Sequence, residues 1–392
     1  MKKTVAIIIN TTWNIYNFRL GLIKALQKEG YNVVAISPTD SYVEKLEAIG
    51  CKHYDIKINN KGTNPFEDLK LVNSYFSLFK KISPDIILAY TIKPNIYGSL
   101  AAKMLNIPVI SNISGLGTVF LSKKLSSKVA RGLYRFALKI PKKVFFQNKC
   151  DKSLFIRLKL VKESRTGLLP GSGVNIEDFK PIDIVRDDKK IKFLFVARLV
   201  KDKGLMEYVE AAKAIKERYD NVEFAVLGQF YRNNPTAITT KQMQEWTDSG
   251  LINYLGVSDS VKSVVAQYDC VVLPSYREGL SRVLLEATAM AKPIVTTNTP
   301  GCRDVVEDGK NGFLCKVKNS QDLADKIEKF ISLDAKEKLE MGKRGREKAV
   351  EEFSERLVIS KYFQAIEEIE NNSKPNVQKD LNQPIYAHNL HN

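Results

Sequence analysis

Residues 270–301 read CVVLPSYREGLSRVLLEATAMAKPIVTTNTPG, and their order of apolar and polar residues decides the fold. The apolar run Cys270–Pro274 predicts a buried strand, Ser281–Met290 a helix, and Pro293–Thr297 a second strand. Strands that are apolar throughout, rather than alternating, are typical of parallel sheets covered by helices on both faces. The stretch therefore predicts one strand–helix–strand unit of an α/β fold.

The same rhythm extends over most of the 392 residues. Further strands are expected at Thr4–Asn10, Asn32–Ser37, Asp85–Tyr90, Pro108–Ile113, Lys143–Gln147, Ile191–Ala197, Val222–Leu227, Asn253–Leu255 and Gly312–Cys315. Helical patterns separate these strands. Two such series predict two Rossmann-like, doubly wound domains that face a cleft, because such sheets bind ligands at the carboxyl ends of their strands.

The polar segment PIDIVRDDKK at 181–190 marks the domain boundary. We expect a first domain over residues 1–185 and a second over 186–352. A helix over 353–369 is expected to cross back and join the first domain. Residues 370–392 are rich in Asn, Gln and Pro and are expected to form a loose tail.

Composition excludes several classes of protein. The chain is 44% hydrophobic, with 21 glycines and 14 prolines, so it is neither disordered throughout nor collagen-like. Its five cysteines form no C-x-x-C pair, which argues against a disulfide framework and against a zinc site. No apolar run approaches 18 residues, and the start does not read as a signal peptide. We therefore expect a cytoplasmic protein that can touch a membrane surface.

The formal charge of +17 is confined to one half of the chain. Residues 1–180 contain 29 Lys and Arg against 12 Asp and Glu, whereas residues 181–392 contain 32 of each kind. Such asymmetry indicates a nucleic acid or an anionic membrane as partner of the first half. A charge that serves only solubility is the alternative.

Two cations follow the predicted strand at 191–197. Arg198 and Lys203 stand in the segment RLVKDKG, which leads into a helix. Cations beside a helix N-terminus can hold a diphosphate. Two solvated loop cations would give the same pattern.

Two carboxylates lie eight positions apart, after the next candidate strand. Glu278 stands at the strand end, and Glu286 lies in a helix among Leu and Ala residues. A carboxylate on an apolar surface needs partners, and paired sugar hydroxyls would suit it. The alternative is an ordinary helical glutamate.

Taken together, VARLVKDKG, the Leu227–Gly228 pair and LPSYREGLSRVLLEATAMAKPIVTTNTPG resemble the donor-binding domain of glycosyltransferase family 4, which has the two-domain GT-B fold. The resemblance implies that Arg198 and Lys203 bind the diphosphate of a nucleotide sugar, and that Glu278 and Glu286 form the family's E-x7-E pair. Glu278 would lie near the sugar hydroxyls and Glu286 would hold the ribose. The other donor-binding residues that it implies are Gly228, Val257, Ser275, Gly279, Leu280 and Ser281.

Three loops of the first half are candidates for acceptor binding. Asn17 and Arg19 follow the first strand, and Lys93 follows the strand that ends at Tyr90. The segments TIKPNIYGSLAAK and SGLG look like those of family members that extend polyprenyl-diphosphate-linked sugars. This likeness adds Gly115 and Gly117 to the acceptor candidates. A solvated loop lysine is the alternative for Lys93.

The chain has three histidines, His53, His388 and His391, and none follows a strand that faces the predicted cleft. An inverting transferase needs a general base, which is often histidine. We therefore expect a retaining mechanism in which Arg198, Lys203 and Glu278 are the catalytic residues and the two cations stabilise the leaving diphosphate. No D-x-D motif stands on a suitable loop, so we expect no metal and no cofactor.

A helix predicted over 122–138 combines an apolar stripe with a basic arc. At 100° per residue, Leu125, Val129, Leu133, Phe136 and Ile140 share one face. The basic residues of the predicted membrane surface are Lys124, Lys128, Arg131, Arg135, Lys139, Lys142 and Lys143. This pattern suits an interfacial helix on anionic lipid. A core helix with a solvated basic face is the alternative.

The leading hypothesis is a retaining glycosyltransferase on the cytoplasmic face of the membrane. It would move a sugar, such as an N-acetylhexosamine or related hexose, from a UDP-sugar to a polyprenyl-diphosphate-linked saccharide in polysaccharide or glycan synthesis. Nucleic acid is not expected as a partner. Two alternatives remain: a nucleotide-sugar epimerase of related fold, and a basic protein that binds nucleic acid or a membrane surface.

Overall fold

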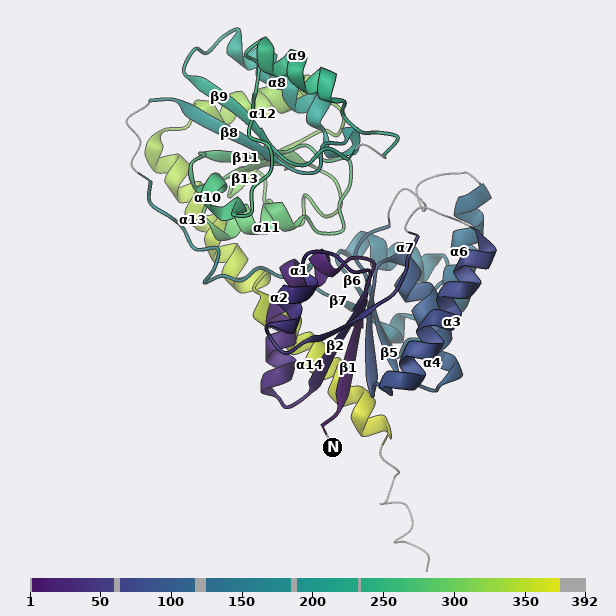
Figure 1. The fold of residues 1–392 in the computed structure, drawn as a ribbon. Helices are drawn as coiled ribbons and strands as arrows, with labels where there is room; N and C mark the ends of the chain where they lie inside the picture. Colours follow the sequence, from purple (N-terminus) through teal and green to yellow (C-terminus); the bar gives the residue numbers. More distant parts are fainter. Residues whose placement is uncertain (1, 60–63, 117–124, 185–188, 232–233, 374–392) are drawn as a thin grey trace, which may run out of the picture.

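The structure, a computed structural model, describes residues 2–59, 64–116, 125–184, 189–231 and 234–373. Two α/β units follow each other along the chain, and the last helix returns to the first unit (Figure 1). Each unit has a parallel sheet between layers of helices. This arrangement confirms the predicted two-domain fold.

Within the described residues, the first sheet has seven strands in the order β3-β2-β1-β4-β5-β6-β7. Its strands are β1 (Thr4–Ile8), β2 (Asn32–Ser37), β3 (Lys52–Asp55), β4 (Ile86–Tyr90), β5 (Val109–Ile113), β6 (Lys143–Phe146) and β7 (Thr166–Leu168). The chain runs from β1 to one edge and from β4 to the other. The order therefore reverses between β1 and β4, where doubly wound sheets bind ligands.

The helices of the first unit cover both faces of this sheet. They are α1 (Thr12–Lys28), α2 (Val43–Glu47), α3 (Pro65–Ile82), the π-helical turn η1 (Pro94–Gly98), α4 (Ser99–Met104), α6 (Leu125–Ala137), α7 (Lys149–Arg157) and the 3₁₀ turn η2 (Glu163–Arg165). On one face, Tyr75 and Phe79 of α3 pack with Ile87 and other strand residues. On the other face, Ile23 of α1 packs with Leu88.

The second sheet has six parallel strands among the described residues, in the order β10-β9-β8-β11-β12-β13. They are β8 (Ile191–Val196), β9 (Val222–Leu227), β10 (Asn253–Tyr254), β11 (Cys270–Leu273), β12 (Ile294–Thr297) and β13 (Gly312–Cys315). Its order reverses between β8 and β11. Most of the residues predicted to bind the donor follow these two strands, whereas Gly228 follows β9 and Val257 follows β10.

The helices of the second unit are η3 (Lys201–Lys203), α8 (Leu205–Lys216), α9 (Thr240–Asp248), α10 (Val261–Ala266), α11 (Arg282–Ala289), α12 (Ser320–Ile331) and α13 (Ala335–Glu352). The buried residues of this unit form one continuous apolar core around the sheet.

The last helix, α14 (Glu355–Ser373), belongs to the first unit, along which it runs in Figure 1. Val358, Tyr362 and Ile366 complete the core beside α1. The helix ends four residues later than the predicted 353–369, so the predicted tail is wrong for residues 370–373. The rest of that tail, 374–392, lies outside the described residues.

The chain passes between the two units twice, and the two passages are hydrogen-bonded to each other. The amide of Val174 donates to Phe353 O at 2.8 Å, and the amide of Glu355 donates to Val174 O at 2.9 Å. The two connections between the units are therefore joined by backbone hydrogen bonds at one place.

Some elements differ from the sequence-based expectations. The helix α7 and the strands β3 and β7 are not among the predicted elements. The helix predicted over 122–138 ends at Ala137, so Lys139 and Ile140 lie beyond it and the helical arc computed through them was too long. Along the described residues, every helix is too short or too polar to cross a bilayer.

Candidate active site

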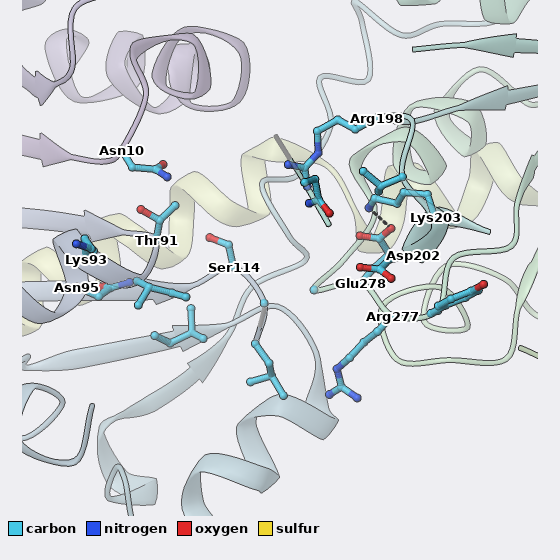
Figure 2. A pocket seen from close by; sticks show the side chains of 18 of the residues that line it. Asn10, Thr91, Lys93, Asn95, Ser114, Arg198, Asp202, Lys203, Arg277 and Glu278 are labelled. Carbon is cyan, nitrogen blue, oxygen red and sulfur yellow. Dashed lines mark hydrogen bonds and ion pairs between the residues drawn. The ribbon is translucent and has the colours of Figure 1, made fainter. Parts of the chain in front are cut away.

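A cleft of about 1050 Å³ lies where the two sheets present their strand ends (Figure 2). From the first unit it is lined by Asn10, Thr91, Ile92, Lys93, Asn95, Ile113, Ser114, Gly115, Leu116 and Tyr134. From the second unit it is lined by Arg198, Val200, Asp202, Lys203, Asn234, Tyr276, Arg277, Glu278, Gly279, Val317 and Lys318. It therefore joins both points at which the strand order reverses.

Arg198 and Lys203 lie on the second unit's wall, in the loop between β8 and α8. The guanidinium of Arg198 stands 5.0 Å from the centre of the Tyr231 ring. Lys203 ends η3, and Gly204 follows with a φ of 78°. A Cβ at Gly204 would lie 2.1 Å from Pro274 O, so only glycine lets this turn approach the end of β11.

Glu278 meets Lys203 across this approach. The ammonium of Lys203 donates to Glu278 Oε1, and both side chains are largely buried. The backbone holds the two loops together, because the amide of Tyr276 donates to Asp202 O at 2.9 Å. Buried Ser275 adds a bond from its hydroxyl to the same carbonyl at 3.3 Å. Ser275 therefore ties the loops together and does not line the cleft.

Gly279 is where the two units touch. A Cβ at this position would stand 1.9 Å from Ser114 O, and Gly115 opposite has a φ of 151°. The side chain of Asn148 donates to Gly279 O at 2.7 Å. A residue with any side chain would hold the units apart here.

An ion pair also crosses between the units. Arg277, at the cleft, donates to Asp151 of α7. Burial raises the pKa of Asp151, and the neighbouring guanidinium opposes that rise. Sequence reasoning missed Asp151, because α7 carries no pattern that relates it to the distant Arg277.

Glu286 lies away from the cleft wall, buried on α11. Its Oε1 accepts from Arg282 Nε at 2.7 Å. Burial raises the pKa of Glu286, and Arg282 opposes the rise. Arg282 lies 5.6 Å from the ring centres of Phe18 and Phe179, and it also donates to Gly173 O. The glutamate predicted to hold ribose is therefore paired with Arg282 in this structure.

The remaining predicted donor residues surround this wall. A Cβ at Gly228 would lie 1.8 Å from Ala197 O, which explains the glycine by packing. Ser281 is buried and precedes α11 as its N-cap residue, and Leu280 packs against Gly171. Val257 is 68% exposed. Of the predicted donor set, Arg198, Lys203, Glu278 and Gly279 line the cleft.

Of the residues predicted to bind the acceptor, Lys93 and Gly115 line the cleft. Lys93 Nζ pairs with Asp68 Oδ1 of α3 at 2.6 Å, and Tyr97 donates to Asp68 Oδ2 at 2.6 Å. Burial, followed by this carboxylate, raises the pKa of Tyr97. Gly117 lies outside the described residues.

Asn17 and Arg19 lie away from the cleft. Asn17 is on α1 and donates to Trp13 O at 2.9 Å. Arg19 is buried, and its guanidinium stands 4.4 Å from the ring centre of Tyr90. It therefore packs inside the first unit, where sequence reasoning had placed it in a loop.

The predicted membrane surface is described only in part. Lys124 and the side chain of Lys128 lie outside the described residues. Arg135, Lys139 and Lys142 are exposed, Arg131 is half-buried, and Phe136 between them is 68% exposed. Lys143 differs from these, because it pairs with Glu368 of α14 at 3.2 Å.

The stretch of sequence around this surface contains no acidic residue of its own. Residues 86–150 carry eleven Lys and Arg and no Asp or Glu. The Nζ of Lys139 lies 5.6 Å from the centre of the Phe136 ring, which joins the basic and apolar features.

Metal ligands and histidines are scarce around the cleft. Within the described ranges, no three His, Cys, Asp or Glu side chains gather as a metal site would require. The described lining residues include no histidine. His53, on the edge strand β3, bonds to Ser37 O at 2.9 Å.

Comparison with known proteins agrees with this geometry. The profile of "Glycosyl transferases group 1" matches residues 177–348, and that of "Glycosyl transferase 4-like" matches residues 4–148. Together they span both units of the fold. The chain is thus a glycosyltransferase with two Rossmann-like domains.

Two named relatives indicate which kind of glycosyltransferase the chain resembles. The chain is 29% identical over 372 residues to N,N'-diacetylbacillosaminyl-diphospho-undecaprenol alpha-1,3-N-acetylgalactosaminyltransferase of Campylobacter jejuni, covering 91% of this chain and 96% of the relative. It is 28% identical to UDP-Gal:alpha-D-GlcNAc-diphosphoundecaprenol alpha-1,3-galactosyltransferase of Escherichia coli, over 64% of this chain and 67% of the relative. Both relatives act on undecaprenyl-diphosphate-linked sugars. These matches agree with the resemblance to glycosyltransferase family 4.

Solved structures agree on the fold. The Anabaena protein HepE in complex with UDP and glucose superimposes with a TM-score of 0.75 at 18% identity, covering 93% of this chain and 99% of that one. Its GT-B arrangement is the one found here.

Proposed function

We propose that this protein is a retaining glycosyltransferase that moves a sugar from a UDP-sugar to a polyprenyl-diphosphate-linked saccharide at the cytoplasmic face of a membrane. The observation that carries the donor half of the proposal is the convergence of Arg198, Lys203 and Glu278 where the second sheet reverses its order. Two cations and one carboxylate there suit a diphosphate next to a hydroxyl-bearing sugar.

The cations support catalysis without a metal. When the bond between the anomeric carbon and the phosphate oxygen breaks, negative charge develops on the leaving diphosphate. Arg198 and Lys203 would stabilise that charge, which is the role that a divalent ion plays in other transferases. EDTA should then leave turnover unchanged. A loss of activity with EDTA that is reversed by adding Mg²⁺ would contradict this.

The lining chemistry supports a retaining mechanism. The described cleft wall offers no histidine as a base, whereas the leaving phosphate oxygen can accept the proton of the attacking acceptor hydroxyl. Attack from the leaving-group side forms the new glycosidic bond on the same face of the sugar. NMR of the product should show the anomeric configuration of the donor, and an inverted product would refute this mechanism.

The acceptor half rests on the relatives and on charge. Both named relatives act on diphosphoundecaprenol-linked sugars, and Lys93 brings a cation to the first unit's wall. A lipid-linked acceptor requires the enzyme to reach a membrane.

The exposed Phe136, with Arg135, Lys139 and Lys142, offers a surface for anionic lipid. The protein should sediment with anionic vesicles, salt should weaken this, and Phe136→Ala should reduce it. Equal binding to neutral vesicles, or tighter binding to duplex DNA, would count against this surface.

The deciding experiment measures donor and acceptor separately. UDP-, GDP- and ADP-sugars are first compared for protection against thermal unfolding. The protecting sugar is then offered with prenyl-diphosphate-linked N-acetylhexosamine. We expect protection by one UDP-sugar and transfer to the lipid-linked sugar. Transfer only to a free sugar, or protection only by another nucleotide, would overturn the corresponding half.

A further inference from the structure

On the first unit's side of the cleft, four neutral polar side chains lie beside Lys93, whose charge is paired with Asp68. Asn10, Thr91 and Asn95 lie there with Ser114 and form a floor opposite the charged side chains of Arg198, Lys203 and Glu278 (Figure 2). Asn10 follows β1 and Thr91 follows β4, so this floor is the reversal point of the first sheet. Position and chemistry both suit a neutral sugar rather than a phosphate.

Thr91 holds an unusual backbone conformation at this floor. Its φ is 63°, in the left-handed region that β-branched residues rarely enter. The π-helical turn η1 follows directly, and such turns are frequent at functional sites. Strained residues of this kind persist where the local geometry serves a site.

Two buried oxygen atoms on this floor have no partner. Thr91 Oγ1 and Asn95 Oδ1 make no hydrogen bond within the described part of the chain, although both residues line the cleft. Asn95 is 1% exposed, and its other side-chain atom, Nδ2, donates to Asn112 O at 2.9 Å. That bond fixes which atom of the amide remains unpaired. Asn95 Oδ1 can only accept, so it requires an O–H or N–H donor.

We propose that Thr91 and Asn95 form the subsite that holds the terminal sugar of the acceptor, through hydrogen bonds with an O–H or amide N–H substituent of its ring. The inference rests on the proposed transferase function and adds the residues that select the acceptor sugar. Sugar binding supplies the donor that the free protein lacks, so an acceptor without that substituent leaves the carbonyl unpaired. A site with a buried polar group discriminates strongly against a ligand that leaves this group without a hydrogen bond.

Thr91→Val tests the subsite because it keeps the shape of the side chain. In the free protein this change removes a hydroxyl that has no partner, so the melting temperature should stay the same or rise. The acceptor KM, measured with the prenyl-diphosphate N-acetylhexosamine probe, should rise about tenfold, the value of one hydrogen bond. The melting shift produced by UDP should not change.

Asn95→Ala provides a second test, although it also removes the bond to Asn112 O. It should raise the acceptor KM and lower the melting temperature. Matched controls exist for both variants. Thr288 carries a buried hydroxyl without a described partner, far from the cleft lining, and Asn311 is a buried asparagine whose two side-chain atoms are both bonded. Thr288→Val and Asn311→Ala should leave the acceptor KM unchanged.

Deoxy analogues of the acceptor identify the substituent. With the wild type, an acceptor that lacks the substituent bound by Thr91 should show about the same rise in KM as the Thr91→Val variant shows with the unmodified acceptor. When the Thr91→Val variant is assayed with that deoxy acceptor, the rise in KM should be no larger than for either change alone. Unchanged acceptor KM in both cleft variants, or an equal rise in the controls, would overturn the subsite alone. Failure of the wild type to transfer to any prenyl-diphosphate sugar, with UDP protection intact, would overturn the proposed function and the subsite with it.

Discussion

At the scale of single residues, the ammonium of Lys203 is the group on which transfer should depend most. It lies at the cleft, paired with Glu278, on the wall expected to receive the diphosphate. Lys203→Ala should lower kcat by roughly 10²–10³, the usual cost of removing one group that stabilises developing charge.

Lys201→Ala is the matched control, because Lys201 begins the same short turn, is exposed and does not line the cleft. It should retain near-normal kcat. Steady-state kinetics and circular dichroism on both variants check the comparison. Equal losses in the two would refute the assignment of Lys203.

Residue-scale reasoning from sequence located the side chains that follow strands at the reversal points. Arg198, Lys203 and Glu278 could be found because strand ends are readable from apolar runs. Arg19 could not be placed, because its contact with Tyr90 depends on how α1 is rotated about its axis. Glu286 pairs with Arg282 four positions earlier on the same helix, a spacing that the sequence shows, but its burial depends on how α11 packs. The loop that contains Thr91 and Asn95 was predicted from the strand end, but their two unpaired oxygens were not, because burial without a partner leaves no sequence signal.

At the scale of elements, α14 is expected to carry a large share of the first unit's stability. Tyr362 is fully buried, packs 5.3 Å from Phe145 between ring centres, and accepts from Asn112 at 3.0 Å. Tyr362→Ala should lower the free energy of unfolding by about 3–5 kcal/mol.

Leu357→Ala on the same helix is the control, because Leu357 is 37% exposed. This substitution should lower the free energy of unfolding by less than about 1 kcal/mol. Urea titration measures both variants. A small loss at Tyr362 would show that α14 contributes little to the core.

The loop after β12 is fastened to α13 through Glu307. Lys348 and Lys310 donate to its carboxylate and lower its pKa to about 2. A lowered pKa in the folded state means that the stabilisation is present above about pH 4.5 and is lost as the pH falls toward 2. The carboxylate is half exposed, so the pair contributes at most about 1 kcal/mol.

Glu307→Gln should accordingly lower the melting temperature at pH 7, and the difference from wild type should shrink as the pH falls below 4.5. Thermal melts across that range test this. A difference that is constant with pH would show that the ion pairs are not its source.

Element predictions succeeded where apolar periodicity is strong and failed where it is short. The strand β7 has three residues, including a glycine, and none is fully buried. In α7 only Asp151 and Phe155 are buried, which is too little for a helical stripe. Such elements are held by neighbours that no local pattern specifies.

At the scale of the whole molecule, Gly279 controls how closely the two units approach. Gly279→Ala would place a methyl group 1.9 Å from Ser114 O, so the units must separate. Solution scattering should show a larger radius of gyration and kinetics a lower kcat, because closure over a cleft excludes water and orients the reactants.

Gly345→Ala is the control, because a Cβ there meets its nearest neighbour at an ordinary 3.6 Å. Its scattering and turnover should match those of the wild type. An unchanged radius of gyration in Gly279→Ala would show that the loop yields instead of the domains.

The return of α14 to the first unit has a consequence for how the protein is made. The second unit is continuous in sequence and is inserted between the parts of the chain that build the first unit, whose core lacks Val358, Tyr362 and Ile366 until α14 has been synthesised. On the ribosome, the second unit can therefore complete its core before the first. The amino-terminal sheet must wait, partly uncovered, until α14 has emerged.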